Sequence, residues 1–280
     1  MVFTLSSYLA RIGIPQNTSL NPSVDTLKKI MNAHMRSISF ENMDVVQGNP
    51  ISISPDEVFE KLVTRGRGGY CFEQNTLLKS ALVALQFNEP APLLCRVRWG
   101  KAPDQITPFT HMCLSVDLGE EGTFLADVGF AGTNSMDPID LSPSCPPQAK
   151  PEGVFRTVSK SNYRYLEVQD RSDPSQYRAL YCWNDVTPAE QPDLEQSNWF
   201  SFTYPQARFT SQFFAARIAK NENERHHILN DEYVVRNMAG EVTTKRKIKD
   251  LDDLLSLITT KFDLTLPTDT MSLDKFLTKS

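Results

Sequence analysis

The sequence predicts an α+β fold in which helices, then strands, then a mixture of both follow one another along the chain. Apolar residues recur at helical spacing in the first third, alternate with polar residues in the middle third, and mix the two patterns from Thr187 onward. The chain has 280 residues, 40% hydrophobic and 22% charged, which is the composition of a globular protein. We expect three regions, at residues 1–88, 89–190 and 191–280.

Residues 1–88 are expected to be helical. Ser23 precedes apolar residues at helical spacing and is a residue type that caps helices. Residues 54–57 (Ser-Pro-Asp-Glu) predict a second helix start, because the serine and the glutamate are suited to a capping box and the proline to the first helical position. A third helical pattern follows the glycine-rich residues 65–69. Cys71 is therefore expected to open a helix.

Residues 89–190 are expected to form strands, because their apolar and polar residues alternate. The expected strands are residues 94–99, 112–118, 123–130, 163–168 and 177–183. Residues 133–153 contain five prolines, which are too many for a central strand. We expect that segment to be a long surface loop packed across the barrel or sheet.

Residues 191–280 are expected to combine helices and strands. Residues 187–190 (Thr-Pro-Ala-Glu) are typical of a helix start just before this region. Strands are expected near residues 214–218 and 227–235, and Asp250 is expected to cap a final helix.

The charge balance excludes several classes of partner. Lys and Arg total 29 against 34 Asp and Glu, so the net charge is −5 and the isoelectric point is about 5.5. Neither a nucleic acid nor an anionic membrane is an expected partner, because both attract basic surfaces. No apolar run reaches the ~18 residues of a membrane helix, and no signal-peptide pattern follows Met1. We expect a soluble cytosolic protein, and the patterning indicates no oligomeric state.

Cysteine usage indicates free thiols and no metal site. The five cysteines are Cys71, Cys95, Cys113, Cys145 and Cys182. Their odd number and scattered positions do not form a disulfide framework. No CxxC or HExxH spacing offers ligands to a metal. If the chain performs covalent chemistry, one of these thiols is the candidate nucleophile.

Cys71 is the thiol best placed for such chemistry. A cysteine attacks as the thiolate, and the unpaired amides and dipole at a helix N-terminus favour that negative charge. Gly68 and Gly69 leave room for a substrate to approach the backbone. The alternative is that Cys71 is a small buried hydrophobe, which is the usual situation of an unpaired cysteine.

A cysteine nucleophile needs a base, and the chain has four histidines. His34 lies in an expected helix, where a partly buried structural role is the simpler interpretation. His226 and His227 lie in a polar stretch and are expected on a surface strand. His111 immediately precedes an expected strand, so its ring should project from a rigid sheet edge.

Asp127 is the candidate that orients the base. It lies sixteen residues after His111 and interrupts an apolar run, where a carboxylate is costly without a strong partner. Residues 119–122 (Gly-Glu-Glu-Gly) predict a turn that brings the two side chains together in a hairpin. Both point to one face only if the connection has an odd number of residues or a bulge intervenes. Cys71, His111 and Asp127 then form a candidate nucleophile, base and orienting group.

The residues around these three positions resemble a known family. Residues 67–75 (RGGYCFEQN) are similar to the active-site segment of the arylamine N-acetyltransferases, written RGG-x-C-[FY]-E-x-N. Residues 110–112 (Thr-His-Met) and 127–130 (Asp-Val-Gly-Phe) resemble that family's histidine and aspartate segments. Further matches are residues 8–13, residues 39–42, Arg96, Val97, Trp99, Asn198, Trp199, Pro205 and Phe209.

The resemblance implies a three-part fold: an N-terminal helical bundle with Cys71, a central antiparallel β-barrel with His111 and Asp127, and a C-terminal α/β lid. It implies a cysteine-proteinase-like arrangement of the triad. It also implies that an acyl group, expected to be acetyl, moves from acyl-coenzyme A through a thioester on Cys71 to the nitrogen of an arylamine, hydrazine or N-hydroxyarylamine. Acyl-coenzyme A and a small aromatic amine are the partners that follow, in a role of xenobiotic detoxification.

The resemblance also implies the binding residues. Phe40, Val97 and Phe209 are expected to line the aromatic substrate pocket, and Gly129 and Phe130 are expected to approach coenzyme A. The chain departs from the family pattern in two places. Ser39 replaces the common proline before Phe40, and an alanine stands between Phe130 and the glycine that usually follows directly.

Three other functions fit parts of the sequence. A cysteine protease or transglutaminase-like enzyme also uses Cys, His and Asp in this order, although residues 67–73 resemble no protease segment. An amide synthase of the same family, which closes macrolactams, has the same triad. A ligand-binding descendant without activity is a further alternative, against which the presence of all three polar groups argues.

Overall fold

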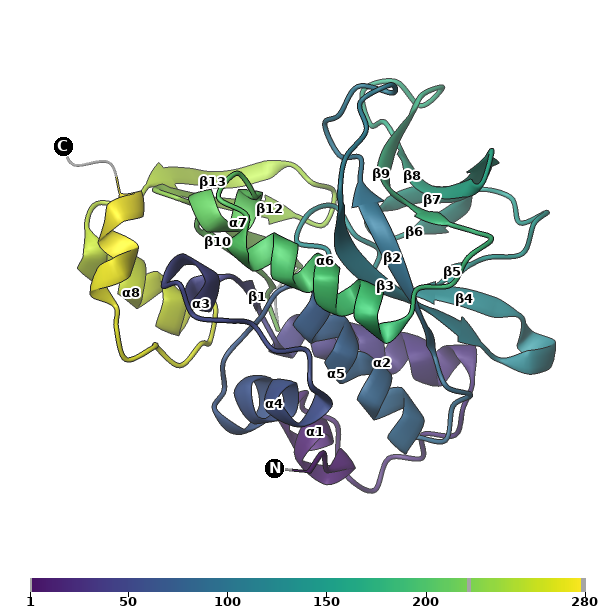
Figure 1. Ribbon diagram of the computed structural model, residues 1–280, viewed down its shortest axis with the longest axis horizontal. Helices are drawn as coiled ribbons and strands as arrows, with labels where there is room; N and C mark the ends of the chain where they lie inside the picture. Colours follow the sequence, from purple (N-terminus) through teal and green to yellow (C-terminus); the bar gives the residue numbers. More distant parts are fainter. Residues whose placement is uncertain (1, 221–222, 278–280) are drawn as a thin grey trace.

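The computed structural model describes residues 2–220 and 223–277. Two antiparallel sheets and a group of helices pack together (Figure 1). The helices are α1 (Leu5–Arg11), α2 (Val24–Ser37), α3 (Met43–Val46), α4 (Pro55–Phe59), α5 (Cys71–Ala84), α6 (Gln191–Thr203), α7 (Arg208–Ser211) and α8 (Leu251–Thr260). Short helical turns of other types cover Glu60–Thr64, Gly119–Glu121 and Met271–Phe276.

The larger sheet has the strand order β5-β4-β3-β2-β9-β8-β7-β6, and the smaller has the order β1-β10-β11-β12-β13. The strands of the larger sheet are β2 (Ala91–Val97), β3 (Phe109–Asp117), β4 (Thr123–Ala126), β5 (Ile139–Asp140), β6 (Gln148–Lys150), β7 (Gly153–Lys160), β8 (Tyr163–Gln169) and β9 (Tyr177–Asn184). Those of the smaller sheet are β1 (Phe40–Glu41), β10 (Phe214–Ile218), β11 (Glu224–Leu229), β12 (Glu232–Asn237) and β13 (Val242–Lys247).

Helix starts in the first region follow the local sequence signals, with one exception. The Ser23 side chain accepts a hydrogen bond from the Thr26 amide at 3.2 Å, so the predicted cap of α2 is confirmed. Helix α4 begins at Pro55 as predicted, but the predicted capping box is wrong. The Ser54 side chain caps no amide of the helix. The Ser54 amide, which would donate to Glu57 in a capping box, donates to Ser52 Oγ instead.

Helix α5 begins at Cys71, as predicted, and is buried among α1, α2, α4 and strand β3. Glu73 accepts a hydrogen bond from the Tyr70 amide at 3.0 Å and so satisfies a donor at the helix start. The helix therefore holds Cys71 at its first turn, at the boundary between the helices and the larger sheet.

The larger sheet curls into a nearly closed barrel. Two hydrogen bonds of 3.0 Å join its edge strands, β5 and β6. The Asp140 amide donates to Gln148 Oε1, and Gln148 Nε2 donates to the Asp140 carbonyl. The strands predicted from alternation are present, with ends that differ by a few residues, and β7 was not predicted. The interior holds the aromatic rings of Phe155, Tyr181 and Trp183.

The prediction that residues 133–153 form a surface loop is wrong. The segment contains β5 and β6, and Met136 and Ile139 in it are buried. All five prolines lie outside the two short strands. Proline is excluded from central strands because it has no amide to donate. Edge strands of two and three residues need few backbone amides, so they can form between prolines.

The smaller sheet joins the beginning of the chain to its last third, because β1 pairs with β10. The single strand predicted near 227–235 is wrong: β11 and β12 are separate and turn at Asn230, whose φ of 52° is one that asparagine tolerates. The helix predicted from residue 187 begins only at Gln191, because Asn184 Oδ1 accepts the amides of residues 186 and 187 and holds that segment in a turn. Asp250 caps α8 as predicted.

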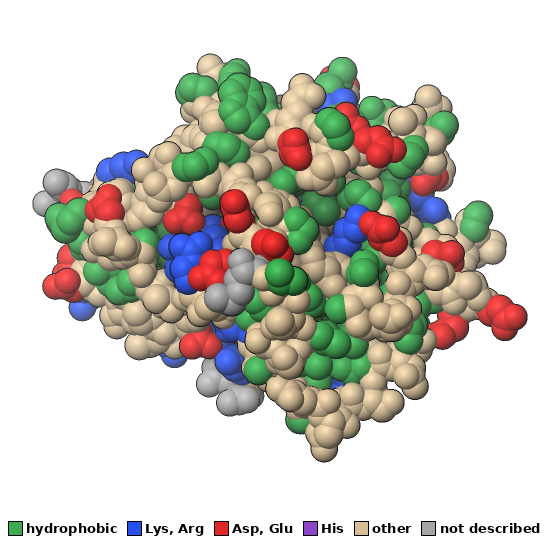
Figure 2. All heavy atoms as spheres, turned by 60° about the horizontal axis from the view of Figure 1, so that its bottom comes forward, with side chains coloured by type: hydrophobic (Ala, Val, Ile, Leu, Met, Phe, Trp, Pro, Cys, Tyr) green, Lys and Arg blue, Asp and Glu red, His purple; other side chains and the backbone are tan. Residues whose placement is uncertain are grey.

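Acidic and basic side chains are interspersed on the face that Figure 2 shows. Within residues 2–220 and 223–277, no helix has the length and apolar composition needed to cross a bilayer.

Candidate active site

The hairpin of β3 and β4 brings His111 and Asp127 together. The two strands pair without a bulge as far as Asp117 and Thr123, so the connection is residues 118–122, an odd number. This meets the condition for both side chains to point to one face. His111 Nε2 lies 2.8 Å from Asp127 Oδ2, and both side chains are buried.

Cys71 meets this pair from the helical side. Its Sγ lies 3.6 Å from the carbonyl oxygen of Thr110, the residue before His111, and the side chain is only 2% exposed. Gly129, two residues after Asp127, packs on the Cys71 backbone. The structure therefore brings the three residues predicted as a triad to one place, although they come from a helix, a strand and the residue that follows a strand.

The electrostatics of the cluster favour a charged His111. Burial opposes the charge, but the attraction of the Asp127 carboxylate outweighs it, and the hydrogen bond to Asp127 and the nearby Cys71 sulfur add to it. The pKa of His111 is therefore raised well above its ordinary value. Burial would raise the pKa of Asp127, but His111 and the hydrogen bonds to this carboxylate lower it. Asp127 is thus an anion that the imidazolium compensates.

Asn75 connects the nucleophile's helix to the carboxylate. It lies one turn after Cys71 and donates to Asp127 Oδ1 at 3.1 Å and to the Met112 carbonyl at 2.8 Å. Its own side-chain oxygen accepts the Val128 amide at 3.1 Å. Sequence reasoning did not assign Asn75 a role, although it is the last residue of the RGGYCFEQN segment. The asparagine fixes the spacing between the helix and the hairpin.

Two aromatic rings enclose His111. The ring centroids of Tyr181 and Phe130 lie 4.8 Å and 5.2 Å from that of the imidazole. The Tyr181 hydroxyl is buried without a hydrogen bond of good geometry. Burial is the largest cause that raises the pKa of Tyr181, and the nearby Asp127 carboxylate is the second. The sequence did not indicate that Tyr181 belongs to the site, because its place in an alternating strand predicts only a core residue.

A buried ion cluster supports the start of α5. Lys61 Nζ lies 2.7 Å from Glu73 Oε1 and 2.6 Å from Asp44 Oδ2. Arg67 Nη2 lies 3.1 Å from both Glu41 Oε1 and Asp44 Oδ1. Burial opposes the charge of Lys61, but the surrounding carboxylates raise its pKa, so it stays protonated. The cluster holds the glycine-rich turn that precedes Cys71.

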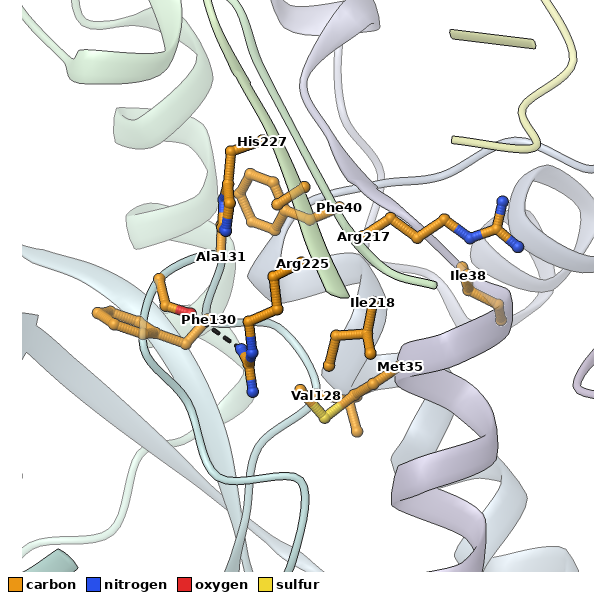
Figure 3. Close-up of a pocket in the computed structure, with 12 residues that line it drawn as sticks. Met35, Ile38, Phe40, Val128, Phe130, Ala131, Arg217, Ile218, Arg225 and His227 are labelled. Atoms are coloured by element: carbon orange, nitrogen blue, oxygen red, sulfur yellow. Dashed lines mark hydrogen bonds between the residues drawn. The ribbon is translucent and has the colours of Figure 1, made fainter. Parts of the chain in front are cut away.

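Of the three residues expected to bind substrate, the two phenylalanines lie close together. The rings of Phe40 and Phe209 are 5.8 Å apart, and Phe209 is 5.6 Å from Tyr70. Phe40 and Phe130 line one pocket, shown in Figure 3. Neither Phe209 nor Val97 is among the residues that line it, and Val97 lies on β2 opposite Tyr181.

The backbone at Phe40 is held in place, although Ser39 stands where the family commonly has a proline. The Ser39 hydroxyl donates to the Phe262 carbonyl at 2.6 Å, and its own carbonyl accepts Gln74 Nε2 at 2.8 Å. Phe40 itself pairs with Ala216 in the smaller sheet. These bonds hold the backbone on both sides of the phenylalanine.

Two of the other three histidines have structural surroundings. His34 is fully rather than partly buried, between Tyr8 Oη at 2.9 Å and Gln74 Oε1 at 2.7 Å. His226 is buried and bonded to Tyr233 Oη at 2.6 Å, so the expected surface position is wrong for it. The reason is that β11 is an interior strand, covered on one face by α8 and the segment after it. His227 is half-buried and lines the pocket of Figure 3.

The five cysteines are all free. Cys95 and Cys113 are neighbours inside the barrel, with their sulfur atoms 3.5 Å apart. In the part of the chain that the structure describes, no group of three or more His, Cys, Asp or Glu side chains is placed to hold a metal ion.

Fold and geometry together define an α+β scaffold in which a buried cysteine at a helix start meets a His–Asp pair from a barrel. A family model described as N-acetyltransferase matches residues 23–271. The arylamine N-acetyltransferase of Mycolicibacterium smegmatis is 37% identical over 214 residues, which cover 75% of each chain. The chain belongs to the arylamine N-acetyltransferase family, and it is an enzyme of that kind.

Solved structures support the same assignment. A crystal structure of a Mycobacterium smegmatis N-arylamine acetyltransferase superposes with a TM-score of 0.88 at 31% identity and covers 98% of both chains. The Mycobacterium marinum arylamine N-acetyltransferase in complex with CoA gives the same TM-score at 27% identity, again with 98% of both chains covered.

Proposed function

We propose that this enzyme transfers an acetyl group from acetyl-coenzyme A to Cys71 and from there to the nitrogen of an arylamine, hydrazine or N-hydroxyarylamine. The observation that carries the proposal is the convergence of Cys71, His111 and Asp127 at one buried point. The Mycobacterium marinum relative that was solved with CoA supports the choice of donor.

In the first half-reaction the Cys71 sulfur attacks the thioester carbonyl of the donor. A new carbon–sulfur bond forms at Cys71, the bond to the coenzyme A sulfur breaks, and His111 protonates the leaving thiolate. One thioester replaces another, so the acetyl-enzyme forms at little net cost. The unpaired amides at the start of α5 favour the oxyanion of the tetrahedral intermediate.

In the second half-reaction the amine attacks the acetyl-enzyme. An arylamine is uncharged at neutral pH and keeps its lone pair, so it is a competent nucleophile. His111, now neutral, takes the proton of the attacking nitrogen, and the Cys71 thiolate leaves. Asp127 keeps the proton of His111 on Nε2, so that the other ring nitrogen is free to accept. Coenzyme A leaves before the amine reacts, so the kinetics should be ping-pong.

Intact-mass spectrometry tests this proposal. The protein is incubated with acetyl-, propionyl- and malonyl-coenzyme A, and the gain of one acetyl group on Cys71 is expected, with its loss on addition of an arylamine. Cys71→Ser should gain no stable acyl group, and initial-velocity plots should be parallel. Acyl transfer by the cysteine variant would overturn the mechanism. Loss of the acyl group to water, independent of added amine, would indicate a hydrolase instead.

A further inference from the structure

The pocket of Figure 3 lies where the three parts of the chain meet. The residues that line it are Met35, Ile38, Phe40, Val128, Phe130, Ala131, Gly132, Ala216, Arg217, Ile218, Arg225 and His227. Its volume is about 30 Å³, and a site needs roughly 10–15 Å³ to hold one water molecule. It therefore accepts a small polar group but excludes a further ring.

Strand pairing brings His227 to the same face as Phe40. Phe40 pairs with Ala216, and Ala216 pairs with His227, so the three residues form one row across β1, β10 and β11. The small side chain of Ala216 leaves a gap between the two rings. Figure 3 shows the His227 ring beside Phe40 and Ala131.

His227 is the polar side chain of this pocket that lacks a partner. Arg225 donates to the carbonyl groups of Gly132 and Asn134 at 3.2 Å and 2.9 Å. Arg217 is bonded to Asp263 at 3.1 Å through Nη2, and although its Nε is buried without a partner, its guanidinium group points away from His227 (Figure 3). The ring nitrogens of His227 have no hydrogen bond to any described residue. Burial, and then Arg225 and its neighbours, lower the pKa of His227 to about 4. The imidazole is therefore neutral and offers one donor and one acceptor.

The pocket shares two walls with the candidate triad. Phe130 lines the pocket and lies 5.2 Å from the His111 ring, centroid to centroid. Phe40 forms a bridge with Gly69, two residues before Cys71. The pocket is therefore adjacent to the candidate triad, on the side where Phe130 lies.

We infer that His227 is a specificity-determining residue that hydrogen-bonds a small neutral polar substituent, such as a hydroxyl group, on the side of the arylamine ring opposite the reacting nitrogen. The inference rests on the proposed function and adds the class of acceptor. A neutral substituent is favoured because the guanidinium of Arg225 already has oxygen partners, that of Arg217 points away from His227, and the imidazole carries no charge. The cavity volume limits the substituent to a few atoms.

The test compares aniline with 4-aminophenol as acceptors for the native protein, His227→Leu and His227→Asn. We expect His227→Leu to lower kcat/KM for 4-aminophenol about tenfold, the effect of one lost hydrogen bond, and to change that for aniline less than twofold. Using the ratio of the two acceptors removes their different intrinsic reactivity. His227→Asn, which keeps a donor and an acceptor, should recover part of the preference.

Two measurements separate acceptor binding by His227 from a role of this residue in donor binding or in the stability of the sheet. Thr244→Leu adds the same side chain to an exposed position of the same sheet and should leave the acceptor ratio unchanged. The rate of Cys71 acetylation, followed by mass before any amine is added, should be native in both His227 variants. An equal loss for aniline and 4-aminophenol would overturn the inference. Slower acetylation of Cys71 would also overturn it and would place the donor at His227 instead. If the native protein acetylates neither amine, the proposed function fails first.

Discussion

The backbone of Gly129 packs directly on Cys71. A Cβ atom at position 129 would lie 2.6 Å from Cys71 Cα and 2.7 Å from Asn75 Nδ2, closer than real Cβ contacts occur. The first of these neighbours is backbone and cannot rotate away. The missing side chain of Gly129 therefore sets the distance between the nucleophile's helix and the loop that follows Asp127.

Gly129→Ala is expected to separate these two elements. Overpacking of this kind costs about 1–3 kcal/mol in the free energy of unfolding. The same shift should slow alkylation of Cys71 by iodoacetamide, because His111 would no longer be held beside the sulfur. Gly132→Ala is the matched control for stability, since its Cβ would meet only the Phe130 ring, at 3.2 Å. Equal stability of the two variants would contradict the close-packing argument.

Asp127→Asn is expected to reverse the tautomer of His111. Asp127 Oδ1 accepts from Gly129 and Asn75, so the new amide nitrogen must take the place of Oδ2 and donate to His111 Nε2. The proton then resides on the other ring nitrogen, which can no longer act as base. By analogy with other triads, kcat should fall about 10⁴-fold.

Circular dichroism and steady-state kinetics of this variant should show a folded protein with almost no turnover. Asp140→Asn, which changes a carboxylate on edge strand β5, serves as the control and should retain native activity. A kcat within tenfold of native for Asp127→Asn would show that the carboxylate does not set the tautomer.

The Tyr181 ring and its hydroxyl group should contribute very differently to stability. The hydroxyl is buried without a hydrogen bond of good geometry, so Tyr181→Phe should change the free energy of unfolding by less than about 0.5 kcal/mol. Tyr181→Ala removes the ring that packs on His111 and Phe130 and should cost about 3–5 kcal/mol. Urea unfolding measures both. A loss above about 1 kcal/mol for Tyr181→Phe would mean that the hydroxyl does bond to Asp127.

Stability should fall in mild acid because of His34. Burial lowers the pKa of His34 to about 4 in the folded protein, whereas a histidine in the unfolded chain has a pKa of about 6.5. Between these values only the unfolded chain binds the proton, so falling pH favours unfolding. From pH 7 to pH 5 this group alone should lower the free energy of unfolding by about 2 kcal/mol.

His34→Gln should reduce that pH dependence, measured by urea unfolding at pH 7 and pH 5. The pKa of His227 is also lowered to about 4, so His227→Asn should remove a similar share, and the double variant should have the flattest profile. A His34→Gln profile parallel to the native one would show that His34 is not neutral in the folded state.

The chemistry-bearing residues were predictable because their signals are local. A glycine-rich turn followed by apolar residues at helical spacing predicted that Cys71 begins a helix, and the structure confirms this. The turn after residue 118 placed His111 and Asp127 on one hairpin, and the RGG-x-C motif indicated the family. Each of these signals depends on residues within about one element of one another, and caps, turns and alternation act at that range.

Tertiary structure alone decided what surrounds these residues. Two contacts join segments far apart in the chain: Phe40 pairs with Ala216, and Tyr181 packs on His111. His226 is buried because distant segments cover it. The edge strands β5 and β6 are too short to show any periodicity. Such contacts depend on which surfaces meet after the elements have formed, and a two-residue strand is stabilised by its partner's backbone rather than by its own side chains. Local sequence signals therefore predicted the residues that can do the chemistry, whereas their enclosure and the row from Phe40 to His227 came from packing.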